Sequence, residues 1–178
     1  SAPARLLFAS VQDIFAKEVT PTDEFYVVTK NVIDPTVDPA TWRLTIDGLV
    51  DTPLTFPLAD LQAKMQTEEY ATMECVSNAV GGNLIGTAKW SGLRLVDLLT
   101  TAGVRPSADW VEFTCADGYT VAIPLVKATD PATLLVLEMN DAPLLNQHGA
   151  PARIFVPGKY GMCSAKWVTG ILVVQGEV

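Results

Sequence analysis

The sequence predicts an α+β protein in which mixed β-sheets carry a few short helices. Three observations support this class. Candidate strands outnumber candidate helices, hairpin signals recur along the chain, and strands and helices do not alternate as they do in parallel α/β folds. Because 178 residues without a repeat or a linker fall in the usual single-domain range, we expect one domain over residues 1–178, with residues 1–21 as an N-terminal lead-in.

The first expected elements are an extended segment, a hairpin and a helix. Residues 23–31 (DEFYVVTKN) mix aromatic and β-branched side chains, and a proline-punctuated loop follows them. Residues 42–58 (WRLTIDGLVDTPLTFPL) alternate apolar and polar side chains around Asp47-Gly48, which predicts two strands joined by a tight turn. Residues 58–66 (LADLQAKMQ) repeat apolar side chains at helical spacing and predict a short helix.

The middle of the chain predicts a strand, a loop and a second helix. Residues 70–78 (YATMECVSN) form a candidate strand that runs into a glycine-bearing loop. Further on, Leu95, Leu98 and Leu99 lie on one face of an amphipathic helix, which we expect to end near Gly103.

The last third of the chain returns to strands. Residues 110–125 (WVEFTCADGYTVAIPL) predict a second hairpin that turns at Asp117-Gly118. Residues 134–144 (LLVLEMNDAPL) predict a strand that ends in an Asn-Asp turn. Residues 152–174 predict a strand, a glycine loop and a final strand.

Charge and hydropathy exclude two classes of function. Twelve Lys plus Arg against twenty Asp plus Glu give a formal charge of -8, which disfavours a protein that binds nucleic-acid phosphates over a broad surface. No apolar run approaches the roughly 18 residues that span a membrane as a helix, so we expect the chain as given to be soluble. An anionic ligand would need a few Arg or Lys side chains in specific places.

The three cysteines, Cys75, Cys115 and Cys163, are widely spaced and form no CxxC pair or zinc-type ligand set. One interpretation is that all three are buried as small hydrophobic side chains. Cys75 differs because it follows a predicted strand and precedes the polar loop SNAVGG, so its thiol could point into a cleft at the sheet edge. A lone thiolate cannot build an ordinary zinc or iron–sulfur site, so a cofactor would have to supply most of a metal's coordination.

A second candidate site is the basic segment HGAPARIFVPGKYGMCSAKW. It contains the only histidine of the chain, His148, together with Arg153, Lys159 and Lys166. An arginine, a lysine and the exposed N–H groups of a glycine loop are what a phosphate or diphosphate tail needs. Taken alone, the segment fits equally well a hairpin with a solvated basic face.

Together these segments resemble the oxidoreductase molybdopterin-binding domain shared by sulfite oxidases, plant nitrate reductases and the periplasmic methionine sulfoxide reductase catalytic subunit. The resemblance rests on CVSNAVGGNLIGTAKWSGLRLVDLL (residues 75–99) followed by HGAPARIFVPGKYGMCSAKWV (residues 148–168), with FYVVTKN and WRLTIDGLVDTPLTF upstream. It covers the chain from about Thr22 to Val174. It implies the sulfite-oxidase-type molybdopterin-binding fold.

The resemblance also implies a molybdenum-molybdopterin cofactor (Mo-MPT), with Cys75 as the catalytic residue and thiolate ligand to the metal. The other residues that it assigns to cofactor binding are Tyr26, Val27, Cys115, His148, Arg153, Ser164, Ala165 and Lys166. It further implies a separate electron-transfer partner, such as a membrane haem protein, and an extracytoplasmic location, periplasmic or at the cell surface. The abrupt start of the sequence leads us to expect a chain excised from a membrane-anchored protein.

Two departures from the family pattern bear on the substrate. In sulfite oxidases the loop after the ligand cysteine carries arginines that bind the oxyanion, whereas this chain has SNAVGG. The position before Ser164 is often Lys in the family and is Cys163 here. We therefore expect two-electron oxygen-atom transfer that reduces an S-oxide or an N-oxide, with sulfite-oxidase-like oxidation of a small oxyanion as the less favoured alternative.

Two other functions stay open at this point. The missing arginines and Cys163 also fit a non-catalytic, cofactor-free binding module of the same fold. A thiol enzyme with Cys75 as nucleophile and His148 as base is a third hypothesis. The remaining candidates have structural interpretations: the four tryptophans as packing, Asp117 as a turn former and Tyr119 as an ordinary core or surface residue.

Overall fold

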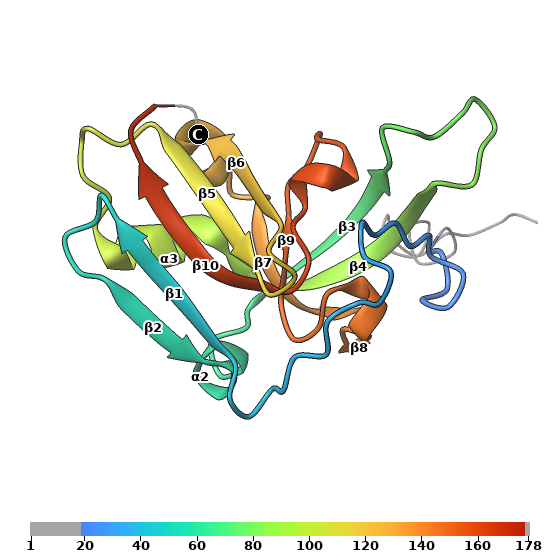
Figure 1. Cartoon of the computed structure of the whole chain (residues 1–178), viewed down its shortest axis with the longest axis horizontal. Coiled ribbons are helices and arrows are strands. Elements are labelled where there is room, and N and C mark those ends of the chain that lie inside the picture. Colours follow the sequence, from blue (N-terminus) through green and yellow to red (C-terminus); the bar gives the residue numbers. More distant parts are fainter. Residues whose placement is uncertain (1–18, 177–178) are drawn as a thin grey trace, which may run out of the picture.

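The computed structural model describes residues 19–176, so most of the lead-in expected at residues 1–21 lies outside the described residues. Within that range, ten strands form two five-stranded sheets, and three short α-helices flank them. Figure 1 shows the first sheet on the left and part of the second sheet extending to the right. The predicted α+β class with mixed sheets and short helices is confirmed.

The first sheet is mixed, because one pair of its strands is parallel and the others are antiparallel. The parallel pair consists of β1 and β10, which lie at the centre of the sheet next to each other. In order across the sheet, the strands are β2 (Leu54–Pro57), β1 (Arg43–Gly48), β10 (Val168–Val174), β5 (Trp110–Cys115) and β6 (Thr120–Pro124).

The main hydrophobic core lies between this sheet and helix α3 (Leu95–Ala102). Alternating side chains of the strands, such as Leu44 and Ile46 of β1, are fully buried in it. As expected, α3 ends before Gly103, whose φ of 74° caps the helix in the left-handed region. The other helices are one-turn connections, α2 (Leu58–Gln62) and α4 (Leu125–Ala128), and among the described residues no helix is long and apolar enough to span a bilayer.

The two predicted hairpins differ in their turns. The second turns at Asp117-Gly118 as predicted. In the first, the pairing of β1 with β2 stops at Ile46, and residues 49–53 connect the two strands instead of the predicted tight turn at Asp47-Gly48. The reason is that β1 continues along β10 as far as Gly48, where a Cβ would overlap the carbonyl oxygen of Val173.

The second sheet is antiparallel throughout. The sequence did not predict its strand β4, because Gly86 and Gly92 make this stretch look like a loop. Both glycines permit close contacts: a Cβ at Gly86 would meet the ring of Phe25, and one at Gly92 would overlap the carbonyl of Leu135 at a β-bulge. The strands are β3 (Thr67–Glu74), β4 (Ile85–Arg94), β7 (Leu134–Met139), β8 (Ala142–Pro143) and β9 (Arg153–Phe155).

A smaller hydrophobic core lies on one face of the second sheet. Its centre is aromatic: Trp90 stacks on Phe155 with ring centroids 5.5 Å apart, and Phe25 meets Trp90 edge-on at 5.5 Å. Met73 of β3 packs in the same cluster. This core therefore joins the second sheet to the N-terminal segment that carries Phe25.

Residues 19–42 contain no helix or strand, and the predicted extended stretch at 23–31 is irregular chain. Long-range hydrogen bonds hold this segment. Asn140 donates to the carbonyl of Thr20 (3.1 Å), and Trp42 donates through Nε1 to the carbonyl of Val168 (3.0 Å). The segment thus runs from the second sheet to the first, as the blue chain in Figure 1 shows.

Candidate functional site

Two adjoining cavities lie between the N-terminal segment, the end of β3 and the chain that leads from the 3-10 helix η1 (Asn146–His148) to β10. The thiol cavity, of about 120 Å³, is named for Cys75; the tryptophan cavity, of about 290 Å³, is named for Trp167. Four residues line both cavities: Val28, Gly161, Met162 and Lys166. The two cavities therefore form one continuous site.

Cys75 lies directly after β3, at the position where the sequence places it. Its N–H donates to the carbonyl of Leu84 (2.9 Å), which closes the loop of residues 75–84 at its base. Asn78 fixes the loop further, because its side-chain oxygen accepts from the N–H of Leu84 (2.9 Å) and its amide donates to Glu74 (3.0 Å). The thiol is half-buried and lines the thiol cavity.

Arg153 of β9 carries a buried guanidinium group at the thiol cavity. It donates to the carbonyls of His148 and Ser164, both at 3.1 Å, and to the sulfur of Met73 at 3.4 Å, and it lies over the ring of Trp90. Its Nε has no hydrogen-bond partner, and no carboxylate of the described residues forms an ion pair with it. Burial lowers its pKa to about 10.

Tyr26 brings a second unsatisfied polar group to the thiol cavity. Its ring stacks on Phe25 at 5.2 Å, and its hydroxyl is buried without a hydrogen-bond partner among the described residues. Burial raises the pKa of Tyr26 to about 12, so the phenol is protonated at neutral pH and has a proton to donate. The hydroxyl lies close to Gly161, where a Cβ would be only 2.7 Å away.

His148 is buried at the end of η1 and lines the same cavity. Its Nε2 lies 3.0 Å from the carbonyl of Thr22, and since a carbonyl only accepts, Nε2 carries the proton. Burial lowers the pKa of His148, and the nearby Arg153 and Lys166 lower it further. The imidazole is therefore neutral at pH 7 and acts here as a hydrogen-bond donor to the N-terminal segment.

Ser164 and Ala165 are buried but line neither cavity. The Ser164 hydroxyl accepts from the N–H of Val156 (3.1 Å), and the Ala165 carbonyl accepts from the N–H of Ile154 (2.8 Å). These contacts fix the chain beside β9 and so place the next residue, Lys166. Its ammonium donates to the carbonyl of Gln147 (3.0 Å), and burial, with the charge of Arg153, lowers its pKa to about 8.

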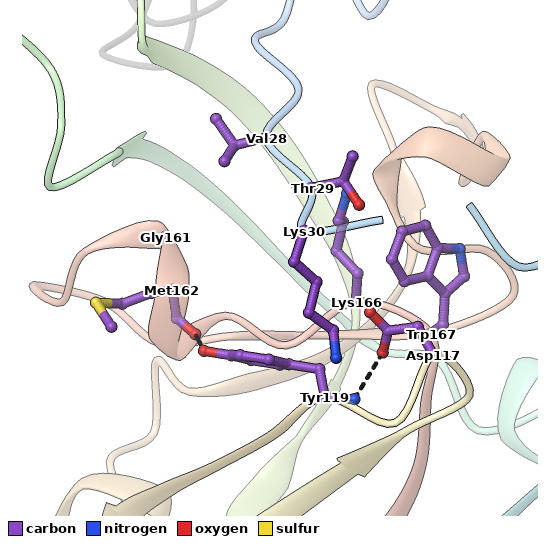
Figure 2. Close-up of a pocket in the computed structure, with 9 residues that line it drawn as sticks. All are labelled: Val28, Thr29, Lys30, Asp117, Tyr119, Gly161, Met162, Lys166 and Trp167. Atoms are coloured by element: carbon purple, nitrogen blue, oxygen red, sulfur yellow. Dashed lines mark hydrogen bonds between the residues drawn. The ribbon is translucent and has the colours of Figure 1, made fainter. Parts of the chain in front are cut away.

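The tryptophan cavity has a polar rim (Figure 2). Asp117 accepts hydrogen bonds from the N–H of Tyr119 and from the Asn31 side chain, both at 3.0 Å. The hydroxyl of Tyr119 donates to the carbonyl of Met162 (3.0 Å), which ties the β6 edge to the 3-10 helix η2 (Gly161–Cys163). Lys30 extends across the cavity with its ammonium 5.8 Å from the Tyr119 ring centre.

The structure brings together most of the residues that the sequence singled out. Tyr26, Val27, Cys75, His148, Arg153 and Lys166 all line the thiol cavity although they are up to 140 positions apart in the chain. Arg153 is buried, which argues against a solvated basic face for its segment, whereas Lys159 is exposed and lines neither cavity.

Cys115 is placed differently from the expected cofactor residues. Its side chain points into the main core, where burial raises its pKa to about 12, and it lines neither cavity. Asp117, two residues later, lines the tryptophan cavity instead. From the sequence, Asp117 was expected as a turn former, Tyr119 as an ordinary core or surface residue and Trp167 as a packing residue. Lys30 carried no local signal at all, because only long-range folding brings it to the site.

Comparison with known proteins identifies relatives of this chain. The family model described as the oxidoreductase molybdopterin binding domain matches residues 31–178. The chain is 36% identical to mitochondrial sulfite oxidase of Drosophila melanogaster over 182 residues, covering 89% of this chain and 31% of that protein. It is 33% identical to the uncharacterized oxidoreductase YuiH of Bacillus subtilis, covering 75% of this chain and 66% of that protein.

A solved structure has a fold similar to that of this chain. The sulfane dehydrogenase SoxCD from Paracoccus pantotrophus matches with a TM-score of 0.83 and 27% identity, over 90% of this chain and 45% of that one. The chain thus spans about a third of the Drosophila relative and less than half of the SoxCD chain. The predicted fold and the molybdopterin cofactor are confirmed at the level of the family. The chain belongs to the oxidoreductase molybdopterin-binding domain family and has the sulfite-oxidase-type fold.

Proposed function

We propose that this domain is a molybdopterin-dependent oxidoreductase that catalyses two-electron oxygen-atom transfer, in the direction that reduces an S-oxide or an N-oxide. The observation that carries the proposal is the composition of the thiol cavity. Within residues 19–176, a single thiol, a buried guanidinium without a carboxylate partner and an unsatisfied phenol face one space. The family of the chain supports the cofactor.

The residues present fit such a cofactor. An uncompensated buried charge costs several kcal/mol unless a counter-charge joins it, so Arg153 favours an anionic ligand. No group of three or more His, Cys, Asp or Glu side chains in residues 19–176 could hold a metal ion without further ligands. Cys75 can therefore supply one thiolate, and the remaining coordination must come with a cofactor.

Each residue of the thiol cavity would have a separate task. Cys75 would bind the metal, while Arg153 and Lys166 would neutralise the anionic parts of the pterin. The protonated hydroxyl of Tyr26 would donate a hydrogen bond toward the bound group. His148 would keep the N-terminal segment closed over the cavity through its bond to Thr22. When bound, the cofactor supplies the redox-active metal that gains or loses two electrons as an oxygen atom is transferred.

The composition of the loop next to Cys75 favours an uncharged substrate. Residues 75–84 (CVSNAVGGNL) contain no Arg or Lys, and the side chains of Val76 and Val80 are exposed there. A loop without cations offers no counter-charge to a small oxyanion, whereas it tolerates a neutral sulfoxide or N-oxide. The cations that line the thiol cavity, Arg153 and Lys166, are committed to the cofactor in this proposal, and Lys30 lines the tryptophan cavity instead.

A second candidate function is oxidation of a small oxyanion. It is favoured by the relatives named sulfite oxidase, of which the Drosophila protein is 36% identical to this chain. For this reaction Lys166 or Lys30 would have to serve the substrate: Lys166 lines both cavities and would also serve the cofactor, whereas Lys30 lines the tryptophan cavity alone. We further propose that a separate electron-transfer protein, such as a membrane haem protein, exchanges electrons with the domain. We also propose that the domain works outside the cytoplasm.

The test combines metal analysis with turnover. Protein made in a host with the cofactor pathway should contain about one molybdenum and release a fluorescent oxidised pterin. With a reduced dye it should consume sulfoxides or N-oxides faster than it oxidises sulfite. A Cys75→Ser variant should lose molybdenum, with Cys115→Ser as the matched thiol control that keeps it. Folded protein that stays free of molybdenum would instead favour a non-catalytic binding module.

A further inference from the structure

Trp167 combines an unusual backbone conformation with a direct contact to Lys166. We propose that Trp167 is a positioning residue, which holds the Lys166 ammonium at the junction of the two cavities so that an anionic group of the cofactor meets it there. This inference rests on the proposed function, since it concerns the same cofactor.

The backbone of Trp167 is strained. Its φ is 52°, in the left-handed region, where a bulky aromatic residue is an outlier. The conformation persists because hydrogen bonds fix it on two sides. The indole Nε1 donates to the carbonyl of Asn146 (2.8 Å), and the Trp167 carbonyl accepts from the N–H of Ala116 (2.9 Å). Such strain survives where the surroundings over-determine it, which is common at functional sites.

The strain changes where Lys166 points. In an extended chain, consecutive side chains point to opposite faces. Here Lys166 and Trp167 are consecutive and yet both line the tryptophan cavity, as Figure 2 shows. The Lys166 ammonium lies 4.3 Å from the centre of the indole ring, within the range of a cation–π contact.

Gly149 makes this arrangement possible. It has a φ of 102°, and a Cβ built on it would lie 2.9 Å from Cβ of Lys166 and 3.1 Å from the backbone nitrogen of Trp167. Any other residue at this position would push the 166–167 chain away from η1. The position of the Lys166 side chain is therefore fixed by two segments, one with Gly149 and one with Trp167.

Lys166 needs such a restraint because other forces drive its ammonium away. Burial disfavours its charge and the buried guanidinium of Arg153 repels it, while the attraction of Asp34 and Asp117 is smaller than either effect. No carboxylate of the described residues forms an ion pair with it. The Gln147 carbonyl and the Trp167 ring face hold it instead. Without the ring, a flexible lysine stem would turn toward solvent.

The first test uses cofactor-free protein. Reductive methylation with isotope-labelled formaldehyde gives each lysine a methyl resonance, and the Lys166→Met variant identifies the signal of Lys166. The ring current of Trp167 should displace that signal from those of exposed lysines. In Trp167→Leu the displacement should vanish, and in Trp167→Phe, which keeps an aromatic face, most of it should remain. A signal that does not move in Trp167→Leu would overturn the proposal.

The second test measures loss of molybdenum from the loaded protein after dilution. Removing the ring should speed the loss about tenfold, the scale of one partly desolvated cation–π contact. Trp42→Leu is the matched control for Trp167→Leu, since it also loses an indole ring whose N–H donates to a backbone carbonyl but lies in the main core. It should leave the rate unchanged.

The double variant Lys166→Met/Trp167→Leu separates positioning from general packing. If Trp167 acts through Lys166, the double variant should lose molybdenum no faster than Lys166→Met alone. If the increases in the rate of molybdenum loss of the two single variants multiply in the double variant, the positioning role is refuted. If the wild-type protein takes up no molybdenum, the proposed function fails, whereas the methyl resonance in cofactor-free protein still decides whether the Trp167 ring lies against the Lys166 ammonium.

Discussion

Replacing Arg153 by methionine should separate cofactor binding from fold stability. Methionine keeps much of the apolar stem and removes the guanidinium, which is buried without a carboxylate partner in the described part of the chain. The change therefore deletes a charge that is costly in cofactor-free protein. It also deletes the hydrogen bonds to the carbonyls of His148 and Ser164.

The two effects oppose each other in the cofactor-free protein. The lowering of the Arg153 pKa to about 10 corresponds to roughly 3 kcal/mol against the buried charge. Losing two charge-assisted hydrogen bonds costs about 1.5–3 kcal/mol each. The net destabilisation should thus be about 0–3 kcal/mol, which lowers Tm by less than roughly 12 °C for a domain of this size. Loss of a buried charge partner should weaken cofactor binding far more, by about 2–5 kcal/mol or at least roughly thirtyfold.

Thermal unfolding of cofactor-free protein and molybdenum content per protein measure the two effects. Arg94→Met is the control, because Arg94 forms an exposed pair with Asp97 at 3.0 Å and should change neither quantity appreciably. The reasoning is refuted if Arg153→Met protein keeps its full molybdenum content. It is equally refuted if the cofactor-free variant cannot fold.

Three further predictions concern single residues. Because burial raises the pKa of the Cys115 thiol to about 12, Cys115 should alkylate slowest of the three cysteines in native protein, as peptide mass spectrometry can show; equal rates would contradict its burial. Gly161→Ala should lower molybdenum content several-fold, since its Cβ would lie 2.7 Å from the Tyr26 hydroxyl; an unchanged content would mean that the hydroxyl moves aside without effect. Burial lowers the pKa of His148 in the folded state, so as the pH falls the unfolded state takes up the proton at a higher pH than the folded state does. The contribution of His148 to the free energy of unfolding is therefore fully present above the ordinary histidine pKa and is lost as the pH falls below it. Tm measured from pH 7.5 to 5 should therefore fall more steeply for wild type than for His148→Gln, whose amide can still donate to Thr22; parallel curves would exclude this contribution.

Local patterns predicted the elements that local forces determine. The hairpin at Asp117-Gly118 and the helix that ends before Gly103 follow from turn chemistry and apolar spacing, and the structure has both. β3 ends at Glu74, so Cys75 follows the strand directly and lines a cavity, as expected. In each case the deciding interactions lie within a few residues along the chain.

The remaining features depend on partners far away in sequence. β4 escaped prediction because its glycines are explained only by Phe25 and the Leu135 carbonyl, which come from other segments. Residues 19–42 are held by long-range hydrogen bonds and form no helix or strand. Their sequence therefore has no periodic pattern from which their course could be predicted. The orientation of Asp117 and Trp167 toward one cavity depends on turn and strain geometry that composition does not reveal.

The central place of β10 in the first sheet has a consequence for biosynthesis. This strand is near the C-terminal end of the described chain, yet it pairs with β1 on one side and β5 on the other. During translation, the N-terminal strands must wait for it, and a topology with such distant contacts folds slowly. Arg153 and Lys166 shortly precede β10 in the sequence, so the two cations of the thiol cavity are synthesised late. Loading of the pterin must then follow synthesis of nearly the whole domain.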